Sequence, residues 1–302
     1  MNLIPVEQLL REPFIKIVGY PHCSVEDARE KVREMDMLGV KGILLGGRSV
    51  VDGLRVLGKG CTSIVVKALL DRCSDGDGGD GVCSGRSEDR GTDHHGAIVA
   101  LKIMRSDSGR ASMEHEARML TIANGVGVGP RLVAYGSKVL VMELVDGMHM
   151  MELVRRGGME GSNSSNSSMV RDACTCRIMD GSGNGFRISI RSVLLDVLEQ
   201  CFLLDGIGLD HGELGNMDRH VMVSDRAYII DFESSSMVRR VSNVTSAVNY
   251  LLFGRGSRLG GMLIHDLYSR RDGIIHALRR YRLDMDRERF DELLQSLDLR
   301  FL

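Results

Sequence analysis

The sequence predicts an α+β protein of two lobes, with a sheet in the first half of the chain and helices in the second. Short apolar segments bounded by glycines or charged residues occupy the region from residue 54 to residue 143. Longer segments with helical periodicity follow residue 188. The length of 302 residues suits two lobes, and we place their junction near Asp146. The expected organisation is an extension over 1–53, a first lobe over 54–145 and a second lobe over 146–302.

The first lobe is expected to be a five-stranded antiparallel sheet with one helix. The helix is expected over 112–124, because Met113, Ala117 and Leu120 fall near one face and Gly125 follows the pattern. The five expected strands are short, apolar and separated by turn residues: 54–58, 63–70, 98–104, 131–135 and 139–143.

The second lobe is expected to be mainly helical, with one short hairpin formed by 221–224 and 227–230. In the extension, residues 24–38 have the pattern of an amphipathic helix and residues 42–51 that of a strand, and neither suggests a function. The helices expected in the second lobe are 188–204, 243–253, 264–268, 273–283 and 287–297.

Two segments differ in composition from the rest of the chain. Residues 72–96 and 156–185 are rich in Gly, Ser and Asp and poor in large apolar side chains. Such segments bury too little apolar surface to offset the entropy of ordering them. We therefore expect both to be disordered insertions, one in each lobe.

Charge and cysteine content restrict the class of protein. A net charge of −2 gives no overall field that would attract nucleic acid or an anionic membrane. The seven cysteines are irregularly spaced and follow no signal peptide, which argues against a disulfide framework. No apolar run approaches the roughly 18–20 residues that span a bilayer. The expected location is the cytoplasm, with no membrane partner.

The first motif with chemical content is a glycine-rich turn between two expected strands. Residues 57–65 read LGKGCTSIV, so Gly58 and Gly60 flank Lys59. Glycines at such a turn let backbone N–H groups approach phosphate oxygens. A glycine-rich hairpin without a ligand fits the same residues.

A lysine near the end of the third expected strand is the second motif. Residues 99–102 read VALK, and Lys102 would point into the lobe interior, where an unpaired charge is costly. Glu116 on the expected helix is a suitable partner. The alternative is a lysine at the sheet edge and a solvated glutamate.

The third motif spans a loop and the hairpin that follows it. Residues 211–220 read HGELGNMDRH, and residues 228–233 read YIIDFE. Glu213 enters the loop, Asp218 lies five positions further on, and Asp231 leaves an apolar strand. These acidic groups can converge on one magnesium–phosphate site.

In this order, the motifs resemble the protein-kinase superfamily over roughly residues 54–253. His211-Gly212-Glu213 stands where ordinary kinases have His-Arg-Asp, and Asp231-Phe232-Glu233 stands where they have Asp-Phe-Gly. These spellings resemble RIO-type kinases, the KEOPS-associated kinase and, most closely, the predicted archaeal serine/threonine protein kinases.

The resemblance implies a protein-kinase-like fold that binds ATP and magnesium between the lobes and transfers the γ-phosphate to a serine or threonine hydroxyl. Glu213, Lys102 and Asp231 would be the catalytic residues, and Asp231 and Asp218 would bind the metal. The nucleotide would be held by Gly58, Lys59, Gly60, Ser63, Val65, Ala100, Lys102 and Glu116.

Three departures from the kinase pattern bear on the mechanism. Glu213 is one methylene longer than the usual aspartate, which alters its reach to a substrate hydroxyl. Asp218 replaces the usual metal-binding asparagine, and Asn216 is the alternative ligand two positions away. No Ala-Pro-Glu follows Asp231, so the usual peptide-docking segment is absent or reduced.

Other functions remain open from the sequence. Glu213 is compatible with a nucleotide-binding pseudokinase or an ATPase-like assembly factor. The His-Gly-acid loop also resembles the aminoglycoside and choline phosphotransferases, which phosphorylate small molecules. The protein substrate is unknown. A ribosome- or RNA-associated partner would use the arginine cluster of the C-terminal region, although a solvated helix face is the favoured explanation of these residues: Arg270, Arg271, Arg279, Arg280 and Arg282.

Overall fold

The computed structural model describes residues 3–71, 96–150, 152–153, 175–179, 185–253 and 267–299. The chain divides into two compact units. Unit 1 comprises residues 1–114 and 132–144, and unit 2 comprises residues 115–131 and 145–302. An N-terminal antiparallel sheet is followed by a mostly helical region, so the α+β class is confirmed.

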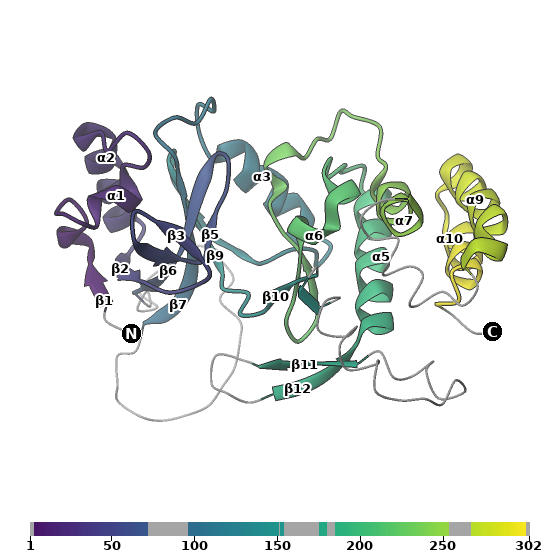
Figure 1. The fold of residues 1–302 in the computed structure, drawn as a ribbon. Coiled ribbons are helices and arrows are strands. Elements are labelled where there is room, and N and C mark those ends of the chain that lie inside the picture. Colours follow the sequence, from purple (N-terminus) through teal and green to yellow (C-terminus); the bar gives the residue numbers. More distant parts are fainter. Residues whose placement is uncertain are drawn as a thin grey trace, which may run out of the picture. The chain divides into compact units, whose positions relative to one another are not determined.

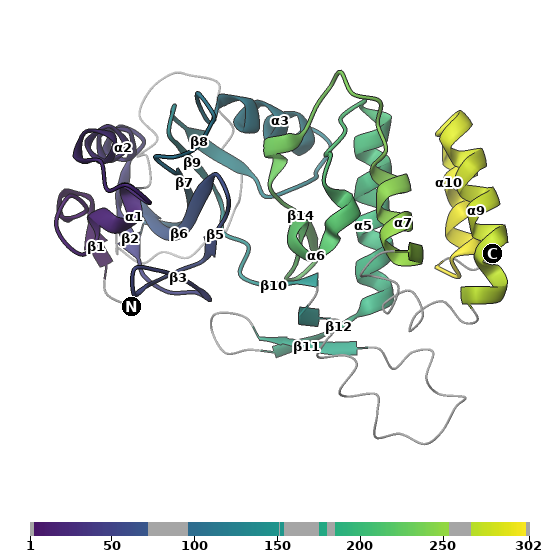
Figure 2. The same cartoon turned by 45° about the horizontal axis from the view of Figure 1, so that its top comes forward.

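Unit 1 is organised around one antiparallel sheet, most of whose strands are labelled in Figure 1, while β8 is labelled in Figure 2. Within the described residues it has seven strands, in the order β1-β2-β6-β7-β9-β8, with β5 also paired to β6. The two longest strands, β6 and β7, pair along their whole length and are rich in Val, Ile and Leu, which favour a pleated surface. The strand bounds are Leu3–Pro5 (β1), Val40–Leu44 (β2), Gly58–Lys59 (β5), Ser63–Leu70 (β6), Ala97–Met104 (β7), Leu132–Tyr135 (β8) and Val139–Glu143 (β9).

The two faces of this sheet have different surroundings. Val99, Leu101 and Ile103 of β7 belong to a core shared with two helices, α1 (Ile15–Val18) and α2 (Val25–Met37). Because side chains alternate along a strand, the even-numbered residues of β7 point to the opposite face. That face carries Lys102, the lysine of the second motif.

The strand count differs from the five strands expected. The segment 42–51 is divided between β2 and β3 (Ser49–Val51). The segment 54–58 forms β4 (Leu54–Val56), which pairs with β3, and contributes only Gly58 to the main sheet. Gly47 explains the break, because its φ of +120° suits glycine and a Cβ there would lie 2.3 Å from the Val56 carbonyl oxygen. The preceding strand β2 pairs with β6, so the extension supplies strands of the sheet.

Helix α2 begins where the sequence predicts, with Ser24 as its N-cap. The Ser24 hydroxyl accepts a hydrogen bond from the Asp27 N–H at 3.4 Å. Ala28 and Met35 lie on its buried face. In Figure 1 α1 and α2, drawn in purple, lie next to each other.

Unit 2 is mostly helical, and its helices match most of the segments expected. A small antiparallel sheet, β10-β13-β14, contains the predicted hairpin. Helices α9 and α10 lie side by side in both views (Figures 1 and 2). The bounds are Glu114–Asn124 (α3), Met148–His149 (β10), Ile190–Gly206 (α5), Met217–His220 (α6), Val221–Val223 (β13), Ala227–Ile229 (β14), Asn243–Phe253 (α7), Leu267–Asp284 (α9) and Arg287–Ser296 (α10).

Helix α3 groups with unit 2, whereas the sequence placed this segment in the first lobe. Its contacts explain the grouping. The ring Nε2 of His115 lies 2.9 Å from the Ser235 carbonyl oxygen. In the turn after the helix, Gly129 lies so close to Phe232 that a Cβ there would come within 2.9 Å of the ring. The helix is therefore held to the segment that follows β14.

The interior of unit 2 contains a buried polar network around Asp205 of α5. Its carboxylate accepts hydrogen bonds from the Tyr281 hydroxyl at 2.9 Å and from the backbone and side-chain nitrogens of Asn243 at 2.9 and 2.8 Å. Burial raises the pKa of Asp205, and these hydrogen bonds oppose the rise. The network ties α5, α7 and α9 together.

The two expected insertions fall largely outside the described residues. Residues 72–95 are not described, and of the segment 156–185 only 175–179 and Gly185 are. In the second segment Thr175–Met179 forms a strand, β11, which pairs with β12 (Gly185–Ser189). This strand differs from the expected disorder, and the β-branched residues Thr175 and Ile178 favour it locally.

Candidate functional site

The glycine-rich turn lies between β5 and β6 in unit 1. Gly58 pairs with Val65, and the Gly60 N–H donates to the Ser63 carbonyl oxygen at 2.8 Å. A Cβ at Gly58 would meet its nearest atom at 3.8 Å, and one at Gly60 at 3.5 Å, which are ordinary contacts. Neither packing nor a positive φ requires glycine at these two positions, so the absence of side chains leaves the turn open to approach from outside.

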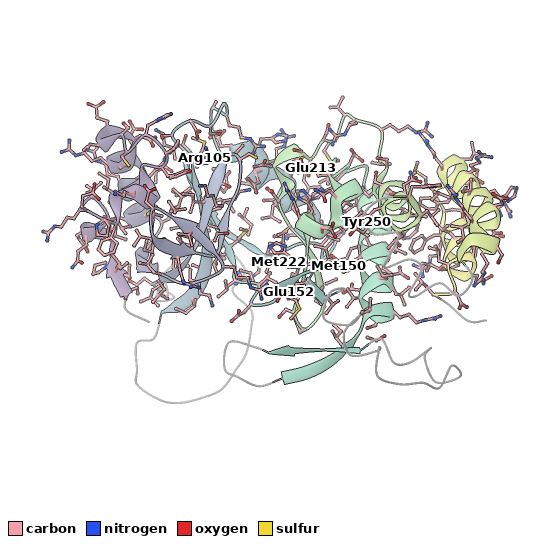
Figure 3. The ribbon with its side chains drawn as sticks, in the orientation of Figure 1. Arg105, Met150, Glu152, Glu213, Met222 and Tyr250 are labelled. Atoms are coloured by element: carbon pink, nitrogen blue, oxygen red, sulfur yellow. The ribbon has the colours of Figure 1, made fainter. Side chains whose placement is uncertain are left out.

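Arg105, a residue of unit 1 that is labelled in Figure 3, holds this turn in place. Its guanidinium donates to the Gly60 carbonyl oxygen at 3.0 Å, and its backbone N–H donates to the Thr62 carbonyl oxygen at 2.8 Å. Two further hydrogen bonds, of 2.8 and 2.6 Å, join the guanidinium to Asp107. They raise the pKa of Arg105 and lower that of Asp107. Sequence reasoning missed Arg105, because it lies outside the motif that it supports.

The extension also reaches the glycine-rich turn. The Nζ atom of Lys59 lies 4.6 Å from the centre of the Tyr20 ring, and the Arg105 guanidinium lies 5.0 Å from the same ring. The Tyr20 carbonyl oxygen accepts a hydrogen bond from the Ser106 N–H at 2.8 Å. Cation–π contacts of this kind stabilise exposed cations by about 0.5–1 kcal/mol each. Tyr20 is therefore part of the support of the turn, which no sequence motif indicated.

Lys102 lies in register with the turn. Val65 pairs with Gly58 on one side and with Lys102 on the other, so the three residues stand across neighbouring strands. Directly opposed residues share a face of the sheet, and Ala100 joins them two positions earlier. Lys102 is buried, with 4% of its surface exposed. Ser63 pairs with Met104 and lies on the same face.

Glu116, the expected partner of Lys102, lies on α3 and belongs to unit 2. It is 3% exposed, as expected of a charged residue with an interior role. Its pairing with Lys102 stays a prediction.

In unit 2, His211 connects the loop that precedes α6 to the interior. Its backbone N–H donates to the Asn243 side-chain oxygen at 2.8 Å, and its Nε2 lies 3.1 Å from the Ile230 carbonyl oxygen. Burial, followed by the nearby His220, lowers the pKa of His211 to about 4. At neutral pH the ring is uncharged, and Nε2–H donates to Ile230. His211 thereby fixes the loop beside the residue that precedes Asp231.

Gly212 explains why the loop reads His-Gly and not His-Arg. Its φ is +89°, and a Cβ there would come within 2.3 Å of the Arg239 guanidinium. Arg239 donates to the buried carboxylate of Asp210 and, at 2.9 Å, to the Ser234 carbonyl oxygen. The guanidinium of a later residue therefore occupies the space that a side chain at 212 would need. This role of Arg239 was not evident from the sequence.

Three potential metal ligands meet around the end of β14. The ligand atoms of Glu213, His220 and Asp231 all lie within 4.8 Å of one another. Oε2 of Glu213 is 3.4 Å from Nε2 of His220. Figure 3 shows Glu213 in the loop before α6. Asp231 has a left-handed backbone, with φ +70°, which is uncommon for a residue other than glycine and recurs at functional sites.

Asp231 also belongs to a second group of ligand atoms. Those of Glu116, Asp231 and Glu233 lie within 4.8 Å of one another. Two of the expected site residues, Glu213 and Asp231, are thus brought together, and a third, Glu116, joins Asp231 through this second group. His220 and Glu233 were not assigned roles from the sequence.

Asp218, the other expected metal ligand, lies apart from both groups. It is buried in α6, and its Oδ1 accepts a hydrogen bond from the Tyr250 hydroxyl of α7, which Figure 3 labels. Its Oδ2 has no hydrogen-bond partner within the described residues. Asn216, the alternative ligand, is the N-cap of α6. Metal binding by Asp218 stays a prediction, and the structure draws attention to His220, two residues further on.

The two groups fit the cofactors that the sequence implies. Carboxylate oxygens suit Mg²⁺, and the open turn suits the phosphates of a nucleotide. None of the described helices is both long enough and apolar enough to cross a bilayer. No protein-family model matches the chain, and a search of the curated proteins finds no similar sequence.

Proposed function

We propose that this protein is an ATP- and Mg²⁺-dependent serine/threonine protein kinase of atypical type, which transfers the γ-phosphate to a hydroxyl group. The observation that carries the proposal is the meeting of Glu213, His220 and Asp231, whose ligand atoms lie within 4.8 Å of one another. Asp231 leaves an apolar strand, β14, as the metal-binding acid of the motif should. A cation held there would neutralise charge on the phosphates of ATP.

Unit 1 carries groups that suit the rest of the nucleotide. Gly58, Val65 and Lys102 stand in register on three neighbouring strands. The point charge of Lys102 suits the α- and β-phosphates, while backbone N–H groups of the open turn suit phosphate oxygens. Ala100 and Val65 supply an apolar surface for the base. These features support ATP as the ligand.

Glu213 is the proposed acceptor-side group. Its Oε2 faces His220, and its second oxygen, Oε1, would accept the hydrogen bond of a substrate hydroxyl. Phosphoryl transfer depends mainly on positioning and on charge stabilisation. The Glu213 carboxylate, which lies on a side chain one methylene longer than aspartate, can therefore still orient the substrate hydroxyl. A metal ion held by Glu213, His220 and Asp231 would supply positive charge that offsets the charge of the phosphates.

A nucleotide-binding pseudokinase is the second candidate, and the pairing of Glu213 with His220 favours it. Because Oε2 of Glu213 already lies 3.4 Å from an imidazole nitrogen of His220, this oxygen is less available to a substrate hydroxyl. Such a protein would bind Mg·ATP without transferring phosphate.

The test is incubation of the purified protein with γ-labelled ATP and Mg²⁺, with and without a mixture of protein substrates. Label on protein supports the kinase, label on a small molecule supports a small-molecule phosphotransferase, and ATP binding without transfer supports the pseudokinase.

Lys102→Ala should lose the rise in melting temperature that ATP causes, because the point charge beside the phosphates is gone. Lys41→Ala is the matched control, since Lys41 is exposed and pairs with Asp71 at 2.8 Å. Unchanged ATP stabilisation in Lys102→Ala would exclude the proposed nucleotide site.

A further inference from the structure

His220 is a buried histidine whose hydrogen bonding is incomplete. The residue is 8% exposed, and its Nδ1 is buried without a hydrogen-bond partner in the described parts of the chain. Its Nε2 faces the Glu213 carboxylate at 3.4 Å. The Ile230 N–H donates to the His220 carbonyl oxygen at 2.9 Å, which places the imidazole next to the strand end that carries Asp231.

Either neutral tautomer of this imidazole leaves a buried nitrogen unmatched among the described residues. With the proton on Nε2, the ring donates to Glu213 and Nδ1 keeps a buried lone pair without a donor there. With the proton on Nδ1, that N–H lacks an acceptor among these residues and the Nε2 lone pair faces a carboxylate oxygen. Buried polar groups without a partner are destabilising and uncommon in folded proteins.

A metal ion changes which arrangement is favourable. If Nε2 and Glu213 Oε2 both bind a cation, their lone pairs no longer repel each other, and the carboxylate of Asp231 supplies a third ligand. Nδ1 then carries the proton, and histidine ligands commonly donate this second N–H to an outer partner such as water. A bound cation would therefore let Nε2 and Oε2 lie close together as two ligands, instead of as a hydrogen-bonded pair.

The type of ligand atom indicates the type of cation. Mg²⁺ prefers oxygen ligands in octahedral geometry, whereas imidazole nitrogen binds first-row transition metals more strongly. One imidazole and two carboxylates form a set suited to Mn²⁺ and its neighbours in the series. Oδ1 of Asp218, the ligand expected from spacing, accepts a hydrogen bond from the Tyr250 hydroxyl, and metal binding by Asp218 stays a prediction.

We infer that Glu213, His220 and Asp231 form a metal site that binds Mn²⁺ in preference to Mg²⁺, with His220 as the nitrogen ligand. The inference rests on the proposed function in that the metal of this site is the one that accompanies ATP. It assigns the cation specificity of the reaction to His220, and it makes the protein a metal-binding protein even before nucleotide arrives.

The experiment is a titration of the full-length protein with Mn²⁺ in the absence of nucleotide. The paramagnetic resonance signal of free Mn²⁺ reports binding, and Mg²⁺ affinity is measured by competition. The parent should bind Mn²⁺ at this site at least about tenfold more tightly than Mg²⁺.

Variants separate the ligands from each other. His220→Asn should weaken Mn²⁺ binding by about tenfold or more while changing Mg²⁺ binding less, so that the preference for Mn²⁺ shrinks. Asp231→Asn should weaken both cations alike. His276→Asn on α9 is the matched control and should change neither. Glu213→Gln tests the same site at a half-exposed position, where the substitution disturbs packing little.

Two results would overturn the inference. One is a parent protein that binds Mn²⁺ no more tightly than Asp231→Asn does. The other is a folded His220→Asn variant that keeps the parent's preference for Mn²⁺ over Mg²⁺. Melting temperature shows whether each variant is folded, and if His220→Asn is unfolded, unchanged Mn²⁺ affinity in Glu213→Gln is the overturning result.

The same preparations are assayed for Mg·ATP binding and phosphotransfer. ATP binding and phosphotransfer together with an unchanged cation preference in His220→Asn refute the metal site alone. A metal site that depends on His220, in a protein that neither binds ATP nor transfers phosphate, refutes the proposed function alone.

Discussion

Two clusters of charged and titratable side chains, one in each unit, differ in the balance of charge that they bring together. In unit 1, Lys31 is completely buried, donates to the Val18 carbonyl oxygen at 2.8 Å and pairs with Asp27 at 2.5 Å. Lys138 bonds the same carboxylate at 2.7 Å. In unit 2, Glu213, His220 and Asp231 gather two acids and one imidazole whose Nδ1 has no partner in the described chain.

The difference teaches how to separate a structural cluster from a functional one. Charges of opposite sign that satisfy one another stabilise a fold and need no ligand. A group with excess negative charge and a nitrogen that has no partner among the described residues is a candidate for binding a cation. The unit 1 cluster has a clear structural role, because it joins α2 to the β8–β9 turn, where the Lys138 N–H also donates to Glu34 at 2.8 Å.

The largest expected effect comes from Asp231→Asn. Removing the charge should lower phosphotransfer and Mg²⁺-dependent ATP binding together, with transfer falling by more than about a hundredfold. Stability should change little, because asparagine also tolerates the left-handed backbone. Transfer assays and thermal unfolding of the same preparation measure both. Loss of folding together with activity would make Asp231 a member of a structural cluster, like Asp27.

Glu213→Gln should separate transfer from ATP binding. It keeps the size and hydrogen bonding of the side chain but removes the negative charge, so transfer should fall by about a hundredfold. ATP binding should fall less than in Asp231→Asn, because Asp231 and His220 would still hold the metal. Measurement is by single-turnover transfer and by ATP-induced thermal stabilisation.

Glu213→Asp is a useful second variant, because it restores the aspartate that the resembled kinases have at this position of the motif. Equal transfer by Glu213→Gln and the parent would exclude Glu213 as the base. A gain of transfer in Glu213→Asp over an inactive parent would show that the natural protein works mainly by binding nucleotide.

In the unit 1 cluster the expected effect is on stability alone. Lys31→Met should lower the free energy of unfolding by about 3 kcal/mol, because the partly buried carboxylate of Asp27 loses one of its two cations. Urea unfolding gives the value, and Lys16→Met is the control, since Lys16 is exposed and lies 3.9 Å from Glu12. Reduced ATP binding by folded Lys31→Met would contradict the structural assignment of this cluster.

The smallest effect concerns the pH dependence of the same cluster. Burial alone would raise the pKa of Asp27, but the hydrogen bonds from Lys138 and Lys31 together lower it. A lowered pKa means that the carboxylate stabilises the fold above its unfolded value of about 3.9, and that this contribution is lost as the pH falls through the folded pKa. The stability difference between the parent and Asp27→Asn should therefore be constant near neutral pH and shrink below about pH 4. A difference that is independent of pH would show that Asp27 is not ionised in the fold.

Much of the fold follows from the sequence, because local patterns specify it. The short apolar segments 63–70 and 139–143, bounded by turn residues, predict β6 and β9 with their observed bounds. The helix over 243–253 also has the predicted bounds. Most apolar side chains of these segments are buried in the structure, so local and tertiary preferences agree.

The edges of the sheet could not be predicted in the same way. Strand β2 joins the main sheet only because β6 offers an unpaired edge to a segment about twenty residues earlier in the chain. Strand pairing at such separations depends on which edges are available after the chain has turned, and Gly47 allows that turn. No local pattern of residues 42–51 contains this information.

By itself, the sequence determined the α+β class, most of the elements and the presence of an acidic residue at the end of β14. Only the tertiary structure decided which groups surround that residue. His220 lies beside Glu213 and Asp231, whereas Asp218 turns toward Tyr250. The physical reason is that residues 217–220 form a single helical turn, in which positions two apart point in different directions. Motif spacing counts residues along the chain, but the direction of a side chain is set by the backbone conformation between them.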